Sequence, residues 1–247
     1  MSGHSKWSTI KRKKGAADAK RGAIFTRISK DITLAAREGG EDPDTNPVLR
    51  LAIKNAKTAN MPAANIERAI NKGTGNLPGI KYENYIYEGY GPGGTAILME
   101  VMTDNKNRTV PDIRHIMSKN GGNLGEQGCV NWMFEKKGTI TASKNGIDED
   151  SLLEMVLDLG ADDFITENDA FVITTTPEDF GVICKGLEDE GYQINGEIGL
   201  TPLNMVNING TDAKQLLSLL DRLEEHEDIQ KVYSNFDLDD SEMESLL

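Results

Sequence analysis

The sequence predicts a multi-domain protein of the α and α+β class: an N-terminal all-α three-helix domain followed by two α+β lobes, one ferredoxin-like and inserted into the other. Three observations lead to this prediction. Residues 16–73 carry apolar side chains at helical spacing and contain no strand-like run. Residues 139–198 follow the order β-α-β-β-α-β. The strand, helix and strand expected over 204–234 cannot form a domain alone, so they should complete a unit begun earlier in the chain.

The N-terminal domain, residues 1–78, is expected to contain three helices. The first covers 16–38, has its apolar side chains on one stripe, and ends at Gly39-Gly40. The second begins at Asn46-Pro47, because asparagine is a good N-cap and proline suits the first helical position. The third begins at Pro62 and ends at Gly73, and a glycine-rich linker follows.

The rest of the chain is expected to form two α+β lobes. Runs rich in β-formers between turn residues predict the strands of the middle lobe. The middle lobe is expected to begin with strands over 82–90 and 95–103 around a turn at 91–94, then a helix over 108–119 and a strand over 128–134. The ferredoxin-like lobe is expected to contain strand 139–143, helix 149–159, hairpin strands 163–166 and 170–175, helix 177–190 and strand 192–198.

The last elements return the chain to the middle lobe. A strand over 204–208, a helix over 211–225 and a strand over 229–234 are expected there. The expected domains are therefore 1–78 (basic, helical), 79–135 plus 200–238 (discontinuous α+β), 136–199 (inserted, ferredoxin-like) and an acidic tail over 239–247.

Charge is distributed very unevenly along the chain. Residues 1–37 hold ten Lys/Arg against two acids, a net of +8, and residues 38–78 are balanced at five against five. The remaining residues hold 12 basic against 33 acidic side chains, a net of −21, so the formal charge of −13 conceals a basic head on an acidic body. A basic head of this size is typical of a surface that meets phosphates, and the acidic body should confine that contact to one end.

The strongest candidate binding segment is Gly3-His-Ser-Lys-Trp7 together with the run Lys11-Arg-Lys-Lys14. Consecutive cations can neutralise several phosphates and release their counterions, although such a run can also be a solvated face. Trp7 can stack on an unpaired base or pack against the helices. The candidate nucleic-acid contacts are Lys6, Trp7, Lys11, Arg12, Lys13, Lys14, Lys20, Arg21, Arg27, Lys30 and Arg108.

Two further segments carry weaker signals. The second and third helices, with a short turn at 60–62, have the spacing of a helix-turn-helix, and the third offers Asn65, Arg68 and Lys72 to a groove. That spacing is also common in helical bundles, so we expect backbone contact more than base readout. Arg108 lies in a polar segment whose neighbours cap a helix, and it is a secondary basic contact or forms a local pair with Asp104 or Asp112.

Other functions find little support in the sequence. There is no nucleophile elbow, HExxH or Walker motif, so an enzyme is a minority hypothesis and no cofactor is expected. The glycine-rich run 91–94 precedes a strand-like segment, which favours a turn over a phosphate loop. The three histidines lack metal-ligand spacing, and Cys129 and Cys184 indicate reduced thiols in a cytoplasmic protein. No run of 18 apolar residues suggests a membrane span.

Several motifs together resemble the YebC/PmpR family, over essentially the whole chain. They are Gly3-His-Ser-Lys-Trp7, Lys20-Arg21, Phe25-Thr-Arg-Ile28, Tyr87-Glu-Gly-Tyr-Gly-Pro-Gly-Gly94, Thr103-Asp-Asn-Lys-Asn-Arg-Thr109 and Gly121-Gly-Asn-Leu-Gly125. The resemblance implies three domains and a bacterial cytoplasmic regulator of transcription that binds DNA. It also implies a competing role on the ribosome, in translation through difficult stretches such as proline runs, since the family includes a mitochondrial translational activator of cytochrome oxidase.

We therefore expect a non-enzymatic regulator whose basic head binds nucleic acid, with double-stranded DNA as the first candidate partner. The alternative is a translation factor that contacts ribosomal RNA or tRNA. The charge pattern leans toward this alternative, because a strongly acidic protein with one basic end has a poor net field for operator binding. No membrane or small-molecule partner is expected, and the sequence leaves the oligomeric state open.

Overall fold

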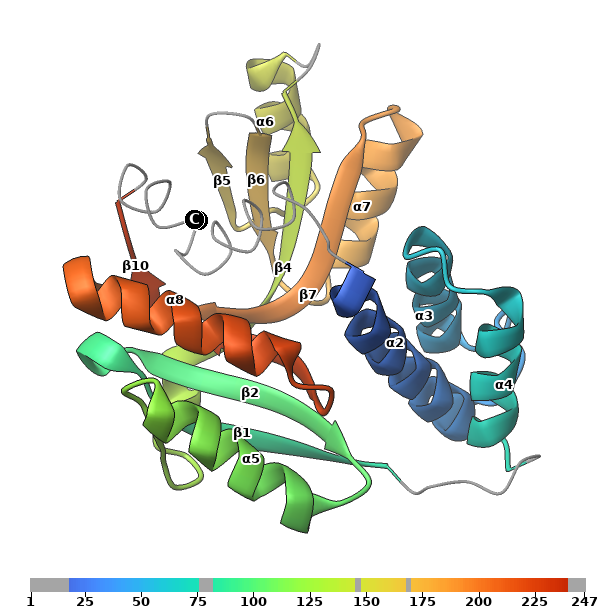
Figure 1. Cartoon of the computed structure of the whole chain (residues 1–247). Coiled ribbons are helices and arrows are strands. Elements are labelled where there is room, and N and C mark those ends of the chain that lie inside the picture. The colour runs from blue at the N-terminus through green and yellow to red at the C-terminus, as the bar shows by residue number, and fades with distance from the viewer. Residues whose placement is uncertain (1–17, 76–81, 145–147, 168–169, 240–247) are drawn as a thin grey trace.

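The computed structural model describes residues 18–75, 82–144, 148–167 and 170–239, with the side chains of the first helix described from Ile24 onward. Figure 1 shows a three-helix head beside two α+β lobes. The multi-domain α and α+β fold class predicted from the sequence is confirmed. Most of the predicted acidic tail, residues 240–247, lies outside the described residues.

The head consists of α2 (Asp18–Gly39), α3 (Pro47–Thr58) and α4 (Ala63–Gly73). Asn46 shapes the α2–α3 connection: its side-chain oxygen accepts from the backbone N–H of Leu49 at 3.0 Å, and its amide donates to the carbonyl of Ala35 at 2.8 Å. It thus caps α3 and holds the end of α2 against it. Gly73 lets α4 approach α2 closely, because a Cβ there would lie 2.4 Å from the carbonyl oxygen of Thr33.

The middle lobe is built on one antiparallel sheet in the order β3-β1-β2-β9. Its strands are β1 (Glu83–Tyr90), β2 (Ala96–Thr103), β3 (Asn123–Leu124) and β9 (Ile229–Ser234). A short 3₁₀ turn, η1 (Pro92–Gly94), joins β1 to β2 where the sequence predicted a turn. Helices α5 (Lys106–Lys119) and α8 (Gly210–Glu225) bury Ile113, Met117 and a row of leucines against β2 and β9.

The second sheet has the order β5-β6-β4-β7, which is the ferredoxin-like arrangement. Its strands are β4 (Phe134–Ser143), β5 (Asp163–Thr166), β6 (Ala170–Thr175) and β7 (Ile194–Pro202). Helices α6 (Glu149–Asp158) and α7 (Phe180–Asp189) share its buried core, which includes Leu152, Val156, Ile183 and Leu187.

These two sheets support the expected division of the chain. β9 pairs with β2 from Ile97↔Ser234 to Val101↔Ile229, whereas β4 pairs with β6 and β7. We propose domains at 1–78, at 79–135 plus 200–238, and at 136–199, with 239–247 as a tail.

The strand predicted over 128–134 is wrong. Residues 131–133 form a 3₁₀ helix, η2 (Asn131–Met133), and β4 begins only at Phe134. The strand expected over 204–208 is reduced to β8 (Val206–Asn207), which pairs in parallel with β10 (Phe236–Asp237). Backbone donors that a strand over 128–131 would use in a ladder are taken by a buried carboxylate instead.

That carboxylate belongs to Glu88 on β1, which is 3% exposed. It accepts backbone N–H groups from Gly128 at 2.7 Å, Val130 at 2.8 Å and Asn131 at 2.7 Å. Burial acts to raise the pKa of Glu88, but the three backbone hydrogen bonds prevail and lower it. Glu88 therefore stays ionised and shapes the loop before β4.

Replacing this carboxylate tests its structural role. Glu88→Gln puts an amide donor against backbone donors, so we expect a loss of about 3 kcal/mol in unfolding free energy. Urea denaturation measures that loss. Glu126→Gln, an exposed substitution in the same loop with the same charge change, should cost much less; equal losses would contradict this role for Glu88.

Candidate nucleic-acid interface

The structure describes only part of the predicted binding set. Lys6, Trp7, Lys11, Arg12, Lys13 and Lys14 lie outside the described residues. Lys20 and Arg21 belong to α2, but the structure does not describe their side chains. Among the predicted binding residues, the structure therefore describes the side-chain contacts of Arg27, Lys30 and Arg108.

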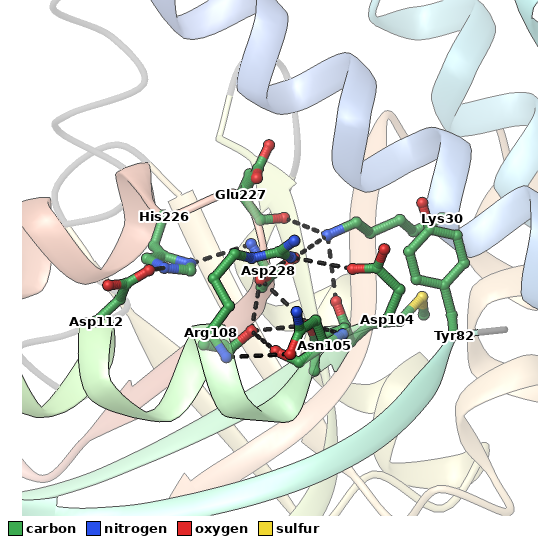
Figure 2. A network of polar contacts seen from close by, with 12 residues as sticks. Lys30, Tyr82, Asp104, Asn105, Arg108, Asp112, His226, Glu227 and Asp228 are labelled. Atoms are coloured by element: carbon green, nitrogen blue, oxygen red, sulfur yellow. Dashed lines mark hydrogen bonds and ion pairs between the residues drawn. The ribbon is translucent and has the colours of Figure 1, made fainter. Parts of the chain in front are cut away.

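The side chain of Lys30 extends from α2 to the middle lobe (Figure 2). Its residue is 4% exposed, and its ammonium lies 2.6 Å from Asp228 Oδ1. It also donates to the backbone carbonyls of Glu227 at 2.9 Å and Met102 at 3.2 Å. A buried ammonium with three acceptors is unavailable to a phosphate, so we propose that Lys30 joins the head to the body.

Arg108, in the first turn of α5, meets the same acid. Its Nη2 lies 2.9 Å from Asp228 Oδ2 and 3.0 Å from Asp104 Oδ1. Asn105 caps the helix by accepting the N–H of Arg108 at 3.2 Å, which fixes the arginine's position. The sequence predicts the pair with Asp104 as an alternative to a nucleic-acid contact of Arg108. It does not predict the pair with Asp228. We propose a structural role for Arg108 as well.

Asp228 is thus the centre of the polar network in Figure 2. Its Oδ2 also accepts from Thr109 Oγ1 at 2.7 Å and lies 3.3 Å from Thr103 Oγ1. Burial acts to raise the pKa of Asp228, but hydrogen bonds from Lys30, Arg108 and Thr109 outweigh it and hold that pKa well below its usual range. Its charge is therefore retained although its side chain is only 1% exposed.

His226 supports the backbone beside this centre. Its Nδ1 accepts the backbone N–H of Asp228 at 3.1 Å, which requires an unprotonated Nδ1. Burial lowers the pKa of His226, against the opposing charges of Asp228 and Asp112, and so favours the neutral ring.

Arg27 lies one turn before Lys30 and is half-buried. Burial lowers the pKa of its guanidinium, and the nearby carboxylates of Glu224 and Asp31 oppose that effect. Arg27 therefore lies in an environment of acidic side chains.

A second basic feature lies on the head itself. Helices α2 and α4 enclose a groove of about 350 Å³, and Tyr82 closes one side of it. Asn65, Arg68 and Lys72 of α4, which the sequence offers to a groove of a nucleic acid, line this groove of the protein. The other lining residues are Phe25, Thr26, Ser29, Lys30, Thr33 and Ala69.

Tyr82 contacts two of the cations that line this groove. The Lys72 ammonium lies 4.7 Å from the centre of the Tyr82 ring, and the Lys30 ammonium lies 5.5 Å from it. Lys72 Nζ is also 3.3 Å from the Tyr82 hydroxyl, and Arg37 donates to the Tyr82 carbonyl at 3.1 Å. The sequence had not indicated Tyr82 or Asp228, since each acts on residues far from it in the chain.

Within the described residues, no three His, Cys, Asp or Glu side chains gather so as to hold a metal ion. None of the helices in these ranges is both long and apolar enough to cross a membrane. Cys129 and Cys184 are half-buried thiols, and burial raises the pKa of each.

Family comparison agrees with this architecture. The profile described as "TACO1/YebC protein N-terminal domain" matches residues 5–76, and "TACO1/YebC second and third domain" matches residues 82–236. The chain belongs to the TACO1/YebC family, as its motifs indicated.

Relatives and a solved structure extend this result. A "probable transcriptional regulatory protein" of Halothermothrix orenii is 53% identical over 250 residues, covering 100% of this chain and 99% of the relative. One of Desulforapulum autotrophicum is 56% identical over 241 residues, covering 97% and 98%. A crystal structure of a conserved hypothetical protein from Aquifex aeolicus superposes with a TM-score of 0.80 at 43% identity, covering 90% of this chain and 93% of that one.

Asp228 offers a direct test of how the head is held. Asp228→Asn leaves Lys30 buried without its counter-charge, so we expect a loss of about 3–5 kcal/mol in unfolding free energy. Amide hydrogen exchange should also become faster around residue 30 of α2. Glu227→Gln is the matched control, because its side chain is exposed and its backbone carbonyl still accepts from Lys30. Equal effects of the two variants would refute the central role of Asp228.

The network also predicts a dependence of stability on pH. Since the folded-state pKa of Asp228 is depressed, its contribution is fully present above the unfolded-state value near 4 and is lost as the pH falls through the folded-state value. The wild-type protein should therefore lose more stability than Asp228→Asn between roughly pH 5 and pH 3. Urea unfolding at several pH values measures this, and parallel curves for the two proteins would count against it.

Proposed function

We propose that this protein is a non-enzymatic regulator that binds nucleic acid through its basic N-terminal head and acts in the cytoplasm. The observation that carries the proposal is the separation of charge: +8 in residues 1–37 against −21 after residue 78. Phosphates are attracted to one end of such a molecule and repelled by the other. The names of the relatives, probable transcriptional regulatory proteins, support a regulatory role.

The proposed contacts are the arm residues Lys6, Trp7 and Lys11–Lys14 with Lys20 and Arg21 on α2. The contacts of Lys30 and Arg108 with Asp228 support a different task for those two residues, which is to set the direction in which the head faces. The first candidate ligand is double-stranded DNA, which a regulator of transcription would contact.

A second candidate function is that of a translation factor on ribosomal RNA or tRNA. The separation of charge also fits it, because the basic head, net +8, would meet RNA phosphates while the acidic body, net −21, would be repelled from them. Sedimentation of cell extracts separates the two candidates. Sedimentation with ribosomes and release by RNase would indicate a translation factor. Absence from the ribosome fractions together with binding to DNA would indicate a regulator of transcription.

The basic arm is tested by replacing Lys11, Arg12, Lys13 and Lys14 with Gln. If each cation meets one phosphate, the slope of log affinity against log salt should become shallower by about 3.6 on duplex DNA or about 2.8 on a single strand. The loss should be similar for every sequence, because phosphates carry no sequence information. Fluorescence anisotropy at several salt concentrations measures it.

The matched control replaces four exposed lysines of the body, Lys119, Lys136, Lys185 and Lys214, with Gln. It removes the same charge and should leave the slope nearly unchanged. A wild-type slope in the arm variant would show that the run is a solvated face. A loss confined to one DNA sequence would indicate base readout instead of phosphate contact.

A further inference from the structure

We propose that the groove between α2 and α4 binds one unpaired nucleotide of a single-stranded segment, with Arg68 and Lys72 on its phosphates and Phe25 and Asn65 against its base. This inference rests on the proposed function and deepens it, because it assigns a specific site and a strand state to the ligand. The groove lies outside the basic arm and outside the Asp228 network, apart from Lys30, which reaches both.

The groove has the size of a small ligand site. Its volume of about 350 Å³ lies near the lower end of the range of roughly 300–1,000 Å³ found for ligand pockets. Two helices form its walls, and Thr33 holds them together by donating to the Ala69 carbonyl at 3.1 Å. A hollow of about 350 Å³ between helices suits a single splayed nucleotide, whereas the bases of a duplex are stacked and paired.

The charge of the groove favours an anion. None of the lining residues is acidic. The charge of Lys30 is balanced by Asp228, whereas Arg68 and Lys72 form no ion pair with any residue in the described ranges. Arg68 is exposed at the mouth, and Tyr82 holds the half-buried Lys72 through its ring and hydroxyl. Arg68 and Lys72 lie four residues apart on α4, and each can donate charge-assisted hydrogen bonds to phosphate oxygens.

The rest of the lining is suited to a base. Phe25 packs against the core of the head and also lines the groove with its aromatic side chain, and base–aromatic stacking is the main attraction in sites for single strands. Asn65 has both a donor and an acceptor on its amide, which can pair with an exposed base edge. Together these groups form an aromatic and polar site beside a cationic one, as an unpaired nucleotide requires.

The test uses the full-length protein and four labelled probes: oligouridine, oligothymidine, and double-stranded RNA and DNA of mixed sequence. The double variant Arg68→Gln/Lys72→Gln removes the proposed phosphate contacts, and Asn65→Trp fills the groove without a change of charge. The matched controls lie on α3. Arg50→Gln/Lys57→Gln removes the same charge from exposed positions, and Asn55→Trp adds the same bulk at another exposed position.

We expect Asn65→Trp to weaken single-strand binding by about tenfold or more and to change duplex binding little. The cation variant should make the single-strand salt slope shallower by about 1.4, which is 0.7 for each lost contact. Both α3 controls should bind like wild type. Ultraviolet crosslinking to 4-thiouridine or 4-thiothymidine oligonucleotides should label peptides that contain Phe25 or Tyr82. Comparison of the two single strands shows whether RNA or DNA supplies the nucleotide.

The inference is overturned if the groove variants bind single strands as the α3 controls do, or if Asn65→Trp weakens duplex and single-strand binding equally. In both cases the Lys11–Lys14 variant can still lose its salt slope, so the proposed function stands without this site. If wild-type protein binds none of the four probes at any salt concentration, both the proposed function and the groove site fail. Thermal melts of each variant exclude unfolding as the cause of a loss.

Discussion

The buried pair of Lys30 and Asp228 is the contact on which the arrangement of this molecule depends. This pair joins side chains of the helical head and the acidic body. One ammonium and one carboxylate, 2.6 Å apart and almost fully buried, fix both the distance and the direction. Arg108 and Thr109 also contact the Asp228 carboxylate, and Asn105 caps the helix that carries both. Neither charge of the pair is therefore left without a partner. Because a buried charge is costly alone, each side of this joint requires the other.

Local sequence patterns predict much of this fold, because helix caps and hairpin turns act over a few residues. The hairpin strands at 163–166 and 170–175 have the predicted bounds, and Asn46-Pro47 begins α3 as expected. The predicted strand over 128–134 failed for a long-range reason: Glu88, forty residues earlier, takes the N–H groups that a ladder would need. β-Formers in a sequence do not reveal that a distant carboxylate competes for their backbone.

The candidate site shows the same division. Composition alone predicts a basic head, and the spacing of Asn65, Arg68 and Lys72 places them on one face of α4. The sequence places Lys30 among the candidate binding cations because nothing near it in the chain reveals Asp228, almost two hundred residues later. Phe25 and Tyr82 could not be assigned to a groove either, since they come from two other segments of the chain. The charge pattern therefore predicts the head as the candidate binding domain, and tertiary contacts decide which of its cations remain accessible.

The pairing of β4 with β7 has a consequence for how the chain folds. The register from Phe134↔Pro202 to Ala142↔Ile194 means that the ferredoxin-like lobe leaves and rejoins the middle lobe at adjacent points. β9 must find β2 across that whole intervening segment, and closing a long loop costs entropy and slows folding. Once the lobe has formed, its two ends already lie side by side, so the loop that remains is much shorter. The folded lobe thus brings α8 and β9 close to the sheet that they complete.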